Sequence, residues 1–372
     1  MLIPPFGFRK WRTSERLNSM NSDNIRKVTP YTPGEQPKDP GIIKLNTNEN
    51  PYPPAPGVEK VLHEYDTDNL RKYPDPTVGK LVHAIADYHG VGDDQVFVGV
   101  GSDDVLSMAF LTFFNSDKPI LFPDITYSFY DVWADVYRIP YETVPLRDDF
   151  TIDPEDYVRD CGGIVIANPN APTGIRMDLS CVERIVSANP DVCVIIDEAY
   201  IDFGGESALP LVSKYDNMLI IRTFSKSRSL AGSRIGYAIG DSSLISYIND
   251  VKYSVNSYTM DSITIDLGVA SIEDDQYFRQ CADRVMSTRE WTVGQLRDLG
   301  FAVLPSATNF VFARHGYIPA MVLFEHLREK GIYVRHFNGK RIYNYLRISI
   351  GTESDMEKLI EVLTQFIERE RA

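Results

Sequence analysis

The sequence predicts an α/β protein with two parts: a large domain with a mostly parallel seven-stranded sheet covered by helices, and a smaller α+β domain. Two patterns support this prediction. Between residues 96 and 240, short apolar segments alternate with segments of helical spacing, as in parallel sheets covered by helices on both faces. Beyond residue 300 the alternation stops, and a few strands with grouped helices follow, which is typical of an α+β arrangement.

The elements of the large domain follow from local patterns. A helix over residues 78–89 is predicted because apolar side chains recur there at helical spacing. Short runs of apolar, aromatic and β-branched residues predict the strands, at residues 96–100, 120–122, 141–144, 164–167, 192–196, 218–223 and 235–239. Between them we expect further helices, at residues 105–114, 131–136 and 179–188.

The smaller domain begins within a long predicted helix over residues 273–299, which Gly300 ends. We expect an antiparallel strand pair to follow at residues 301–304 and 309–313, and then a helix at 320–329 that a glycine stops. Two strands at 332–335 and 345–350 and an amphipathic helix at 355–369 complete the domain.

The N-terminal region differs from both domains. Residues 1–28 lack a long apolar region and a small-residue cleavage site, so we interpret them as an irregular extension, with a transit peptide as the minor alternative. Residues 29–58 are too rich in proline for regular helix or central strand. We expect them to form an arm that lies over another surface through Tyr31, Leu45 and Tyr52. In this interpretation the arm completes a small domain of residues 276–372, beside a large domain of residues 59–275.

Composition limits the partners of this 372-residue chain. Its formal net charge of −14 argues against nucleic-acid and anionic-membrane partners, which need a basic surface on the protein. No apolar segment approaches the roughly 20 residues of a membrane helix, and no histidine or cysteine spacing indicates a metal site. The four cysteines form no C-x-x-C pair, so we expect free thiols and a cytoplasmic location.

A lysine directly after an apolar strand is the strongest single feature. Lys226 follows the predicted strand 218–223 among hydroxyl side chains, and Arg234 lies eight residues further on. Ligands bind at strand ends in α/β sheets, and a lysine with a lowered pKa attacks carbonyl groups. A solvated lysine on a loop is the alternative interpretation.

Two more strand ends carry polar groups. Asp197 closes the strand 192–196, and a buried carboxylate needs a partner such as a metal, an arginine or a protonated ring nitrogen. A helix cap or an ordinary salt bridge is the alternative. Residues 168–174 follow the strand 164–167, and their Pro and Gly residues predict a rigid turn whose Asn amides face a planar ligand, with an ordinary loop as the alternative.

A glycine-rich turn and an aromatic residue follow two further strands. Residues 99–104 expose backbone N–H groups at a predicted helix N-terminus, which suits a single phosphate, although capping by Ser102 alone is equally consistent. Tyr127 follows the strand 120–122, where it can stack on a planar ring or pack in the core. Because all these groups follow parallel strands, one crevice can hold them. Together they are the groups that a pyridoxal-phosphate site needs.

With these segments in this order, the chain resembles the fold-type I pyridoxal-phosphate aminotransferases (class II), and among them the histidinol-phosphate aminotransferases. The resemblance runs from about residue 24 to the C-terminus. The matching segments are LNTNENPYPP (45–54), RKYPDP (71–76), GVGSDD (99–104), FPDITY (122–127), NPNAPTG (168–174), DEAYIDF (197–203), RTFSKSRSLAGSRIGY (222–237), TNFVF (308–312) and YLRISIGT (345–352).

The resemblance implies roles toward the cofactor, pyridoxal 5′-phosphate. Lys226 corresponds to the lysine that binds it covalently, Asp197 to the partner of its pyridinium nitrogen, and Tyr200 to the hydrogen-bond donor to its phenolic oxygen. Tyr127 would stack on its ring. Its phosphate would be held by Gly101, Ser102, Asp103, Thr223, Ser225 and Arg234, and by Tyr73 of a second subunit. The last contact implies a homodimer with shared active sites.

The resemblance also implies substrate contacts. Arg347 corresponds to the arginine that binds a substrate carboxylate, and Arg335 and Tyr31 to residues that contact a substrate phosphate; an exposed salt bridge is the alternative for Arg335. One position departs from the family pattern. Most relatives carry Asn before the proline of N-P-T-G, where this chain has Ala171, so we expect the neighbouring Asn170 to take over the contact with the phenolic oxygen.

The implied reaction is a reversible transamination in histidine biosynthesis. The small-molecule amino donor is L-histidinol phosphate and the 2-oxo acid is 2-oxoglutarate, which become imidazole acetol phosphate and L-glutamate. Aromatic amino-acid transamination or threonine-phosphate decarboxylation on the same scaffold is the alternative. An alternative from a different class of function is a non-catalytic cofactor-binding module. A nicotinamide dehydrogenase is disfavoured because the G-x-G-x-x-G motif is absent.

Overall fold

The computed structural model describes residues 22–37 and 41–371, so most of the predicted N-terminal extension (1–28) lies outside the described residues. The α-helices are α1 (Pro56–Glu64), α2 (Gly79–His89), α3 (Ser102–Phe113), α4 (Tyr130–Tyr137), α5 (Leu179–Ala188), α6 (Ser242–Val255), α7 (Ser262–Glu273), α8 (Asp275–Asp298), α9 (Ala320–Glu329) and α10 (Glu353–Arg371). The strands are β1 (Ile43–Lys44), β2 (Val96–Val100), β3 (Ile120–Pro123), β4 (Tyr141–Val144), β5 (Gly163–Ala167), β6 (Val194–Asp197), β7 (Met218–Thr223), β8 (Ile235–Gly240), β9 (Phe301–Val303), β10 (Phe310–His315), β11 (Ile332–Tyr333), β12 (Arg335–His336) and β13 (Leu346–Ser349).

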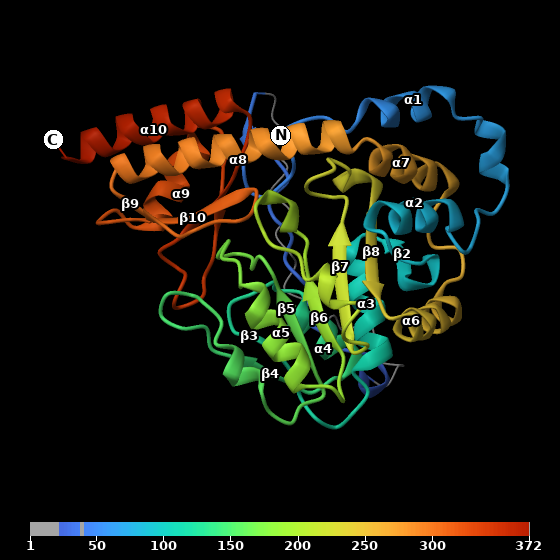
Figure 1. Cartoon of the computed structure of the whole chain (residues 1–372). Coiled ribbons are helices and arrows are strands. Elements are labelled where there is room, and N and C mark those ends of the chain that lie inside the picture. The colour runs from blue at the N-terminus through green and yellow to red at the C-terminus, as the bar shows by residue number, and fades with distance from the viewer. Residues whose placement is uncertain (1–21, 38–40, 372) are drawn as a thin grey trace.

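A seven-stranded sheet lies at the centre of the larger half of the molecule (Figure 1). Its strand order is β2-β8-β7-β6-β5-β3-β4; β8 runs antiparallel to its two neighbours, and the remaining pairs are parallel. These are the seven strands that the sequence predicts, so the mostly parallel sheet is confirmed. In the register of the sheet, Ala167 pairs with Asp197 and Asp197 pairs with Ile221, which brings the carboxyl ends of β5, β6 and β7 to one edge.

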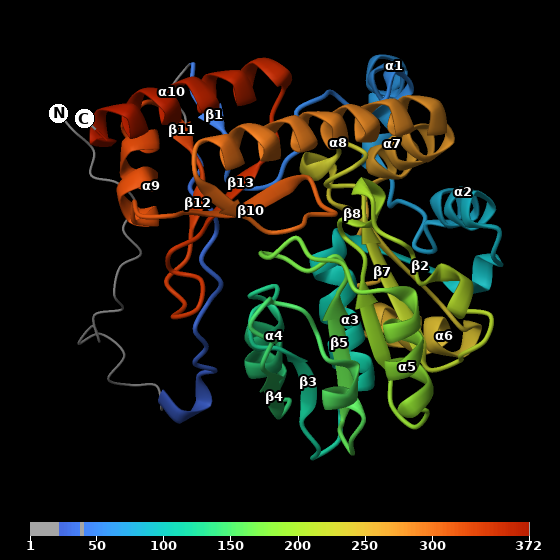
Figure 2. The ribbon, with the colours of Figure 1, turned by 60° about the vertical axis from the view of Figure 1, so that its left-hand side comes forward.

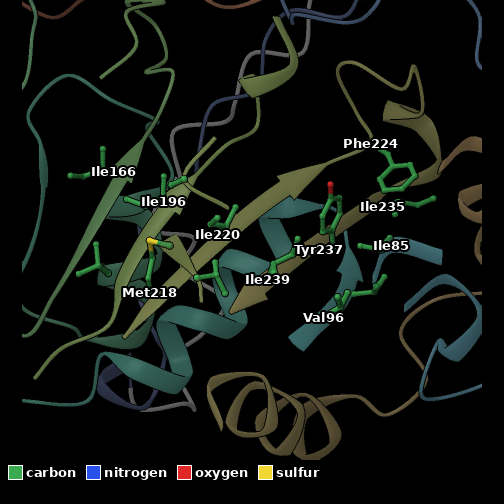
Figure 3. Packing of buried hydrophobic residues seen from close by; sticks show 14 of the residues in the cluster. Ile85, Val96, Ile166, Ile196, Met218, Ile220, Phe224, Ile235, Tyr237 and Ile239 are labelled. Atoms are coloured by element: carbon green, nitrogen blue, oxygen red, sulfur yellow. The ribbon is translucent and has the colours of Figure 1, made fainter. Parts of the chain in front are cut away.

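Both faces of this sheet are covered by helices. On one face, Ile166, Ile196 and Ile220 of neighbouring strands belong to one cluster with Ile85 of α2 (Figure 3). Side chains of α5 and α7 belong to the same cluster. On the other face, Val165 and Leu219 pack with α3, α4 and α6. Successive strand residues point to opposite faces, so a strand buried on both sides needs a continuous apolar run. This requirement explains the Val- and Ile-rich segments of the sequence.

The second half of the molecule contains a four-stranded antiparallel sheet with the order β12-β13-β10-β9, together with α8, α9 and α10 (Figure 2). The proline-rich arm joins this half. Its strand β1 pairs with β11, and its residues Leu45 and Tyr52 are buried in one hydrophobic cluster with Val285 of α8, Ile348 of β13 and Leu363 of α10. The arm therefore lies ordered over the C-terminal elements.

The structure differs from the sequence predictions in three places. The sequence analysis does not predict helices α6 and α7. Helix α7 is apolar on most sides and lacks an amphipathic stripe, whereas the buried stripe of α6 is obscured in the sequence by its exposed Tyr247, Tyr253 and Val255. The expected strand 332–335 divides into β11 and β12, which pair with different strands. Helix α1 begins inside the arm at Pro56, since the first turn of a helix tolerates proline.

Three general features concern the described part of the chain only. None of its helices is both long and apolar enough to cross a membrane. No group of three or more His, Cys, Asp or Glu side chains within it is placed to hold a metal ion. Its four cysteines are free thiols, at positions 161, 181, 193 and 281.

We predict that Leu45→Ala lowers the free energy of unfolding by about 2–4 kcal/mol, because the substitution leaves a cavity between the arm and the C-terminal helices. Urea unfolding followed by circular dichroism measures this change. The matched control is Met321→Ala on the exposed face of α9, which should change stability by about 0.5 kcal/mol or less. Equal losses in the two variants would contradict an anchored arm.

Candidate active site

A cavity of about 170 Å³ lies at the carboxyl ends of β5, β6 and β7. The loops that follow these strands line it, together with the start of α3 and the arm. The polar and aromatic side chains of the lining are Thr47, Glu49, Ser102, Asp103, Tyr127, Asp197, Tyr200, Thr223, Ser225, Lys226 and Arg234. An outer cavity of about 420 Å³ shares several of these residues and adds Tyr31, Arg335 and Arg347. The fold thus brings most of the predicted site residues together.

Lys226 lies in the loop after β7 and lines the inner cavity. Two backbone hydrogen bonds of Phe224 fix this loop. The Phe224 N–H donates to the Ile235 carbonyl (3.0 Å), and the Phe224 carbonyl accepts from the Leu230 N–H (3.0 Å). Lys226 Nζ donates to the Thr47 carbonyl at 3.3 Å and lies 5.8 Å from the centroid of the Tyr200 ring. The side chain is half-buried, so the alternative of a solvated loop lysine does not describe it.

Two adjacent carboxylates after β6 have different environments. Glu198 forms a buried ion pair with Arg222 at 2.8 Å, which is a structural contact. Asp197 instead lines the cavity and accepts hydrogen bonds from two uncharged donors, Tyr130 Oη (2.8 Å) and Ala199 N–H (3.1 Å). Burial raises the pKa of Asp197 to about 6. A buried carboxylate of this kind suits a cationic group bound in the cavity.

The N-terminus of α3 forms one wall of the cavity. Its N-cap is Gly101, with φ of 84°, and no side chain in the described part of the chain caps the helix, so the alternative that Ser102 caps it is wrong. A Cβ at Gly101 would lie 2.4 Å from Nη2 of Arg234, so only glycine leaves room for the guanidinium. Arg234 also lies 3.2 Å from Asp103 Oδ2 and 3.5 Å from Ser225 Oγ. Helix N–H groups beside an arginine are suited to a phosphate.

An aromatic wall stands next to this cradle. The Tyr127 ring lines the cavity, and its hydroxyl donates to Asp103 Oδ1 at 2.8 Å. Burial raises the pKa of the Tyr127 phenol, which therefore stays neutral. The ring packs edge-on against Tyr130, with centroids 5.7 Å apart, so its orientation is fixed. A fixed aromatic face of this kind can stack on a planar ligand.

Two arginines line the outer cavity. Arg347 is half-buried, donates from Nη2 to the Asn46 carbonyl at 2.9 Å, and has a buried Nε without a hydrogen-bond partner among residues 22–37 and 41–371. Burial lowers the pKa of its guanidinium, which marks the cost of holding this charge without an anion. Arg335 Nη2 donates to the Thr32 carbonyl at 3.3 Å, and Tyr31 stacks on Phe129 nearby. The guanidinium groups suit bidentate binding of a carboxylate or phosphate.

The structure does not bring Asn170 to the cavity. Its Nδ2 donates to the Ile125 carbonyl (2.9 Å) and to Thr173 Oγ1 (3.0 Å), and its Oδ1 accepts from Thr126 Oγ1 (2.8 Å). Both ends of the amide are thus used to hold the loop, and Ala171 lines the cavity in its place. The expectation that Asn170 replaces the usual asparagine is corrected accordingly.

Tyr73 also lies outside the cavity of its own chain. Its side chain is 83% exposed, and its ring lies against Tyr258 with centroids 4.7 Å apart. A contact between Tyr73 and a cofactor therefore requires a second subunit.

The arm supplies residues to which the sequence analysis gave no role. Thr47 and Glu49 line the inner cavity, and Asn50 Nδ2 donates to the carbonyls of Lys226 (3.0 Å) and Ser227 (3.2 Å). Asn48 donates to the Tyr200 hydroxyl at 2.9 Å. The matching segment LNTNENPYPP was the available signal, but a proline-rich segment has no periodicity that places it in space.

The sequence model of the family "Aminotransferase class I and II" matches residues 40–363. This chain belongs to that family. The histidinol-phosphate aminotransferase of Lactococcus lactis subsp. cremoris (strain MG1363) is 50% identical over 345 residues, 93% of this chain and 97% of that protein. Histidinol-phosphate aminotransferase 1 of Hydrogenovibrio crunogenus is 51% identical over 351 residues, 94% of this chain and 99% of that protein.

Solved structures agree with the family membership. The histidinol-phosphate aminotransferase of Sinorhizobium meliloti, in complex with pyridoxal-5′-phosphate, superposes with a TM-score of 0.80 at 25% identity, over 89% of this chain and 92% of that one. The enzyme of Clostridium acetobutylicum shares the fold with a TM-score of 0.81 at 23% identity, over 88% of this chain and 100% of that one. The predicted fold type I and the predicted aminotransferase family are confirmed.

The raised pKa of Asp197 has a consequence for stability. Since it lies near 6 in the folded protein, against an ordinary 3.8, its neutral form contributes stability that is complete below about pH 4 and lost as the pH rises through 6. We predict that Asp197→Asn, which stays neutral, stabilises the cofactor-free protein above pH 7 by on the order of 2 kcal/mol.

Thermal unfolding of cofactor-free protein from pH 4 to 8 measures this difference, which should vanish at the acid end. The exposed Asp216→Asn is the matched control and should show no gain that depends on pH. A constant difference between Asp197→Asn and the parent over this range would contradict the raised pKa.

Proposed function

We propose that this chain is a pyridoxal-phosphate-dependent histidinol-phosphate aminotransferase of histidine biosynthesis. It interconverts L-histidinol phosphate and 2-oxoglutarate with imidazole acetol phosphate and L-glutamate. The observation that carries the proposal is the identity of about 50% to histidinol-phosphate aminotransferases over more than nine-tenths of both chains. The two arginines of the outer cavity support it, because every reactant carries a phosphate or a carboxylate.

The inner cavity fits the cofactor residue by residue. Asp197 suits a protonated ring nitrogen, Tyr127 a stacked ring and Tyr200 a phenolic oxygen. The phosphate dianion suits the cradle formed by Gly101, Ser102, Asp103, Thr223, Ser225 and Arg234. Pyridoxal phosphate, when bound, supplies a conjugated ring that takes up the electron pair of a breaking bond at the substrate carbon.

The side chains of the protein then divide the work. As general base, Lys226 would take the proton from the substrate carbon that carries the amino group. As general acid, it would then deliver this proton to a carbon of the bound cofactor. Asp197, whose pKa burial raises, becomes a stable anion when a cation pairs with it, and so holds the proton on the ring nitrogen. Arg347 and Arg335, with Tyr31, bind the phosphate of the donor and the carboxylates of the 2-oxo acid in turn. One site that serves two substrates in succession implies ping-pong kinetics.

The proposal extends to assembly. Exposed apolar side chains gather on two segments, residues 67–73 and α6 with the loop after it: Leu70, Tyr73, Tyr247, Val255 and Tyr258. Such patches mark protein interfaces. We infer a homodimer in which Tyr73 reaches the phosphate cradle of the other subunit.

Packing and cysteine chemistry support proposals for the domain boundaries and for the cellular location. We assign residues 59–275 to the cofactor domain and residues 276–372, with the arm 29–58, to the smaller one, because arm side chains share the C-terminal hydrophobic cluster. The free thiols support a cytoplasmic location, since reducing compartments keep cysteines unpaired.

We predict that Lys226→Ala lowers kcat by at least about a thousandfold, because the proton transfer loses its acid–base group. Borohydride reduction should fix pyridoxal phosphate to the parent protein but not to the variant, as peptide mapping would show. The matched control is Lys214→Ala, an exposed lysine on the opposite end of the sheet, which should keep full activity. Fixation of the cofactor at another lysine would contradict the assignment.

A panel of amino donors with 2-oxoglutarate tests the substrate. We expect activity on L-histidinol phosphate at least about a hundredfold above that on phenylalanine or tyrosine, because neither of these carries a phosphate. Carbon dioxide release from threonine phosphate should be absent. Strong activity on the aromatic amino acids with none on histidinol phosphate would replace the proposed function by the aromatic alternative.

A mixing experiment tests the shared site. Lys226→Ala and Tyr73→Ala proteins should each have low activity, and refolding them together should restore part of it, because a hybrid dimer has one intact site. No recovery, in a mixture that sedimentation shows to contain dimers, would contradict the role of Tyr73.

A further inference from the structure

Asn48 is an arm residue with a complete set of hydrogen bonds. It is 1% exposed, and each of its polar atoms has a partner. Its backbone N–H donates to Ser349 Oγ (2.9 Å), and its carbonyl accepts from Asn309 Nδ2 (2.9 Å). Its side-chain Oδ1 accepts from Ser349 Oγ (2.8 Å), and its Nδ2 donates to the hydroxyl of Tyr200 (2.9 Å).

These contacts fix the direction of each hydrogen bond. A backbone N–H only donates, so Ser349 Oγ accepts from Asn48 and has its own proton left for Oδ1 of the same residue. The amide is thereby oriented with Nδ2 toward Tyr200, and an amide nitrogen also only donates. The Tyr200 oxygen is therefore the acceptor in this contact. The proton of the Tyr200 hydroxyl remains available for a group in the cavity.

The neighbours leave few other donors at this wall. Ala171 has no polar side chain, and the Asn170 amide is used within its loop. The hydroxyl of Tyr127, the other phenol of the inner cavity, donates to Asp103. Among the described residues of the lining, Tyr200 is therefore the phenol whose proton is free.

We propose that Asn48 is a positioning residue that sets the Tyr200 hydroxyl as a hydrogen-bond donor toward the cavity. The inference rests on the proposed function, in which Tyr200 donates to the phenolic oxygen of pyridoxal phosphate. A donor at that oxygen stabilises its anionic form. Asn48 thus makes this anion easier to form without touching the cofactor.

The local backbone explains why asparagine occupies this position. Asn48 has φ of 57°, in the left-handed region, which Asn, Asp and Gly adopt more readily than other residues. Its partners lie at the end of β13 and just before β10, and the Tyr200 ring packs edge-on against Phe310 of β10, with centroids 5.2 Å apart. The residue therefore ties the arm and the smaller sheet to one catalytic side chain.

Two substitutions test the proposal in the holoprotein. Asn48→Asp keeps the size and the backbone preference, but a carboxylate accepts and draws the Tyr200 proton away from the cavity. Asn48→Gly keeps the backbone and removes the amide. The readout is the pH midpoint at which the visible absorbance of bound pyridoxal phosphate changes. We expect it to rise by about one pH unit in Asn48→Asp and by less in Asn48→Gly.

The mechanism requires that the effect pass through Tyr200. In a Tyr200→Phe background, adding Asn48→Asp should therefore leave the midpoint unchanged. Asn189→Asp, at a buried asparagine that bonds Tyr157 and Ile185 carbonyls at the end of α5, is the matched control and should not move the midpoint. In steady-state kinetics, Asn48→Asp should lower kcat about tenfold with KM for the donor within twofold of the parent value.

The outcomes separate this inference from the proposed function. A parent protein that binds no pyridoxal phosphate would overturn the function. If Tyr200→Phe moves the midpoint while Asn48→Asp and Asn48→Gly do not, the positioning role is wrong and the function stands. If Asn48→Asp still shifts the midpoint in the Tyr200→Phe background, the added charge alone causes the shift. That result would also overturn the positioning role. If Asn48→Asp does not fold, Asn48→Gly decides.

Discussion

The register of β5, β6 and β7 is the constraint on which the site depends. These strands are buried on both faces, so a shift by one residue would exchange the side chains that pack in the two cores and break the complementary packing on each face. The register that the core enforces ends the strands together, with Asp197 between Ala167 and Ile221. The polar groups of the following loops then face one cavity. The apolar interior of the sheet thus decides where the chemistry takes place.

Burial also determines the charges of the site. The chain carries a formal net charge of −14, yet the two cavities contain Lys226, Arg234, Arg335 and Arg347. Burial lowers the pKa of Arg347 and raises that of Asp197, so each charge has an unfavourable environment until an ion of opposite sign binds. The site is therefore electrostatically complementary to a ligand with a cationic ring and an anionic group.

Most of the fold could be predicted because six of the seven central strands are largely apolar, the edge strand β4 being the exception. Most of the site could be predicted because polar residues follow those strands directly. Other features depend on packing that leaves no local pattern. Helix α7 is buried on most sides and has no stripe, and the pairing of β1 with β11 joins residues 43 and 332. The same limit explains the wrong expectation for Asn170. This residue is next to Ala171 in the sequence, but its amide is used by partners within the loop and does not reach the cavity.

The arm shows how a segment without periodicity acquires an accurate position. Within five residues, the carbonyl of Asn46 accepts from Arg347 and that of Thr47 accepts from Lys226. Asn48 donates to the Tyr200 hydroxyl, and Asn50 donates to the Lys226 carbonyl. Leu45, directly before them, is anchored in the hydrophobic cluster of the C-terminal elements. Prolines on either side lower the conformational entropy that ordering removes. Because catalysis is sensitive to displacements of about 1 Å, this anchoring makes the packing of the smaller half of the molecule a determinant of geometry at the lysine.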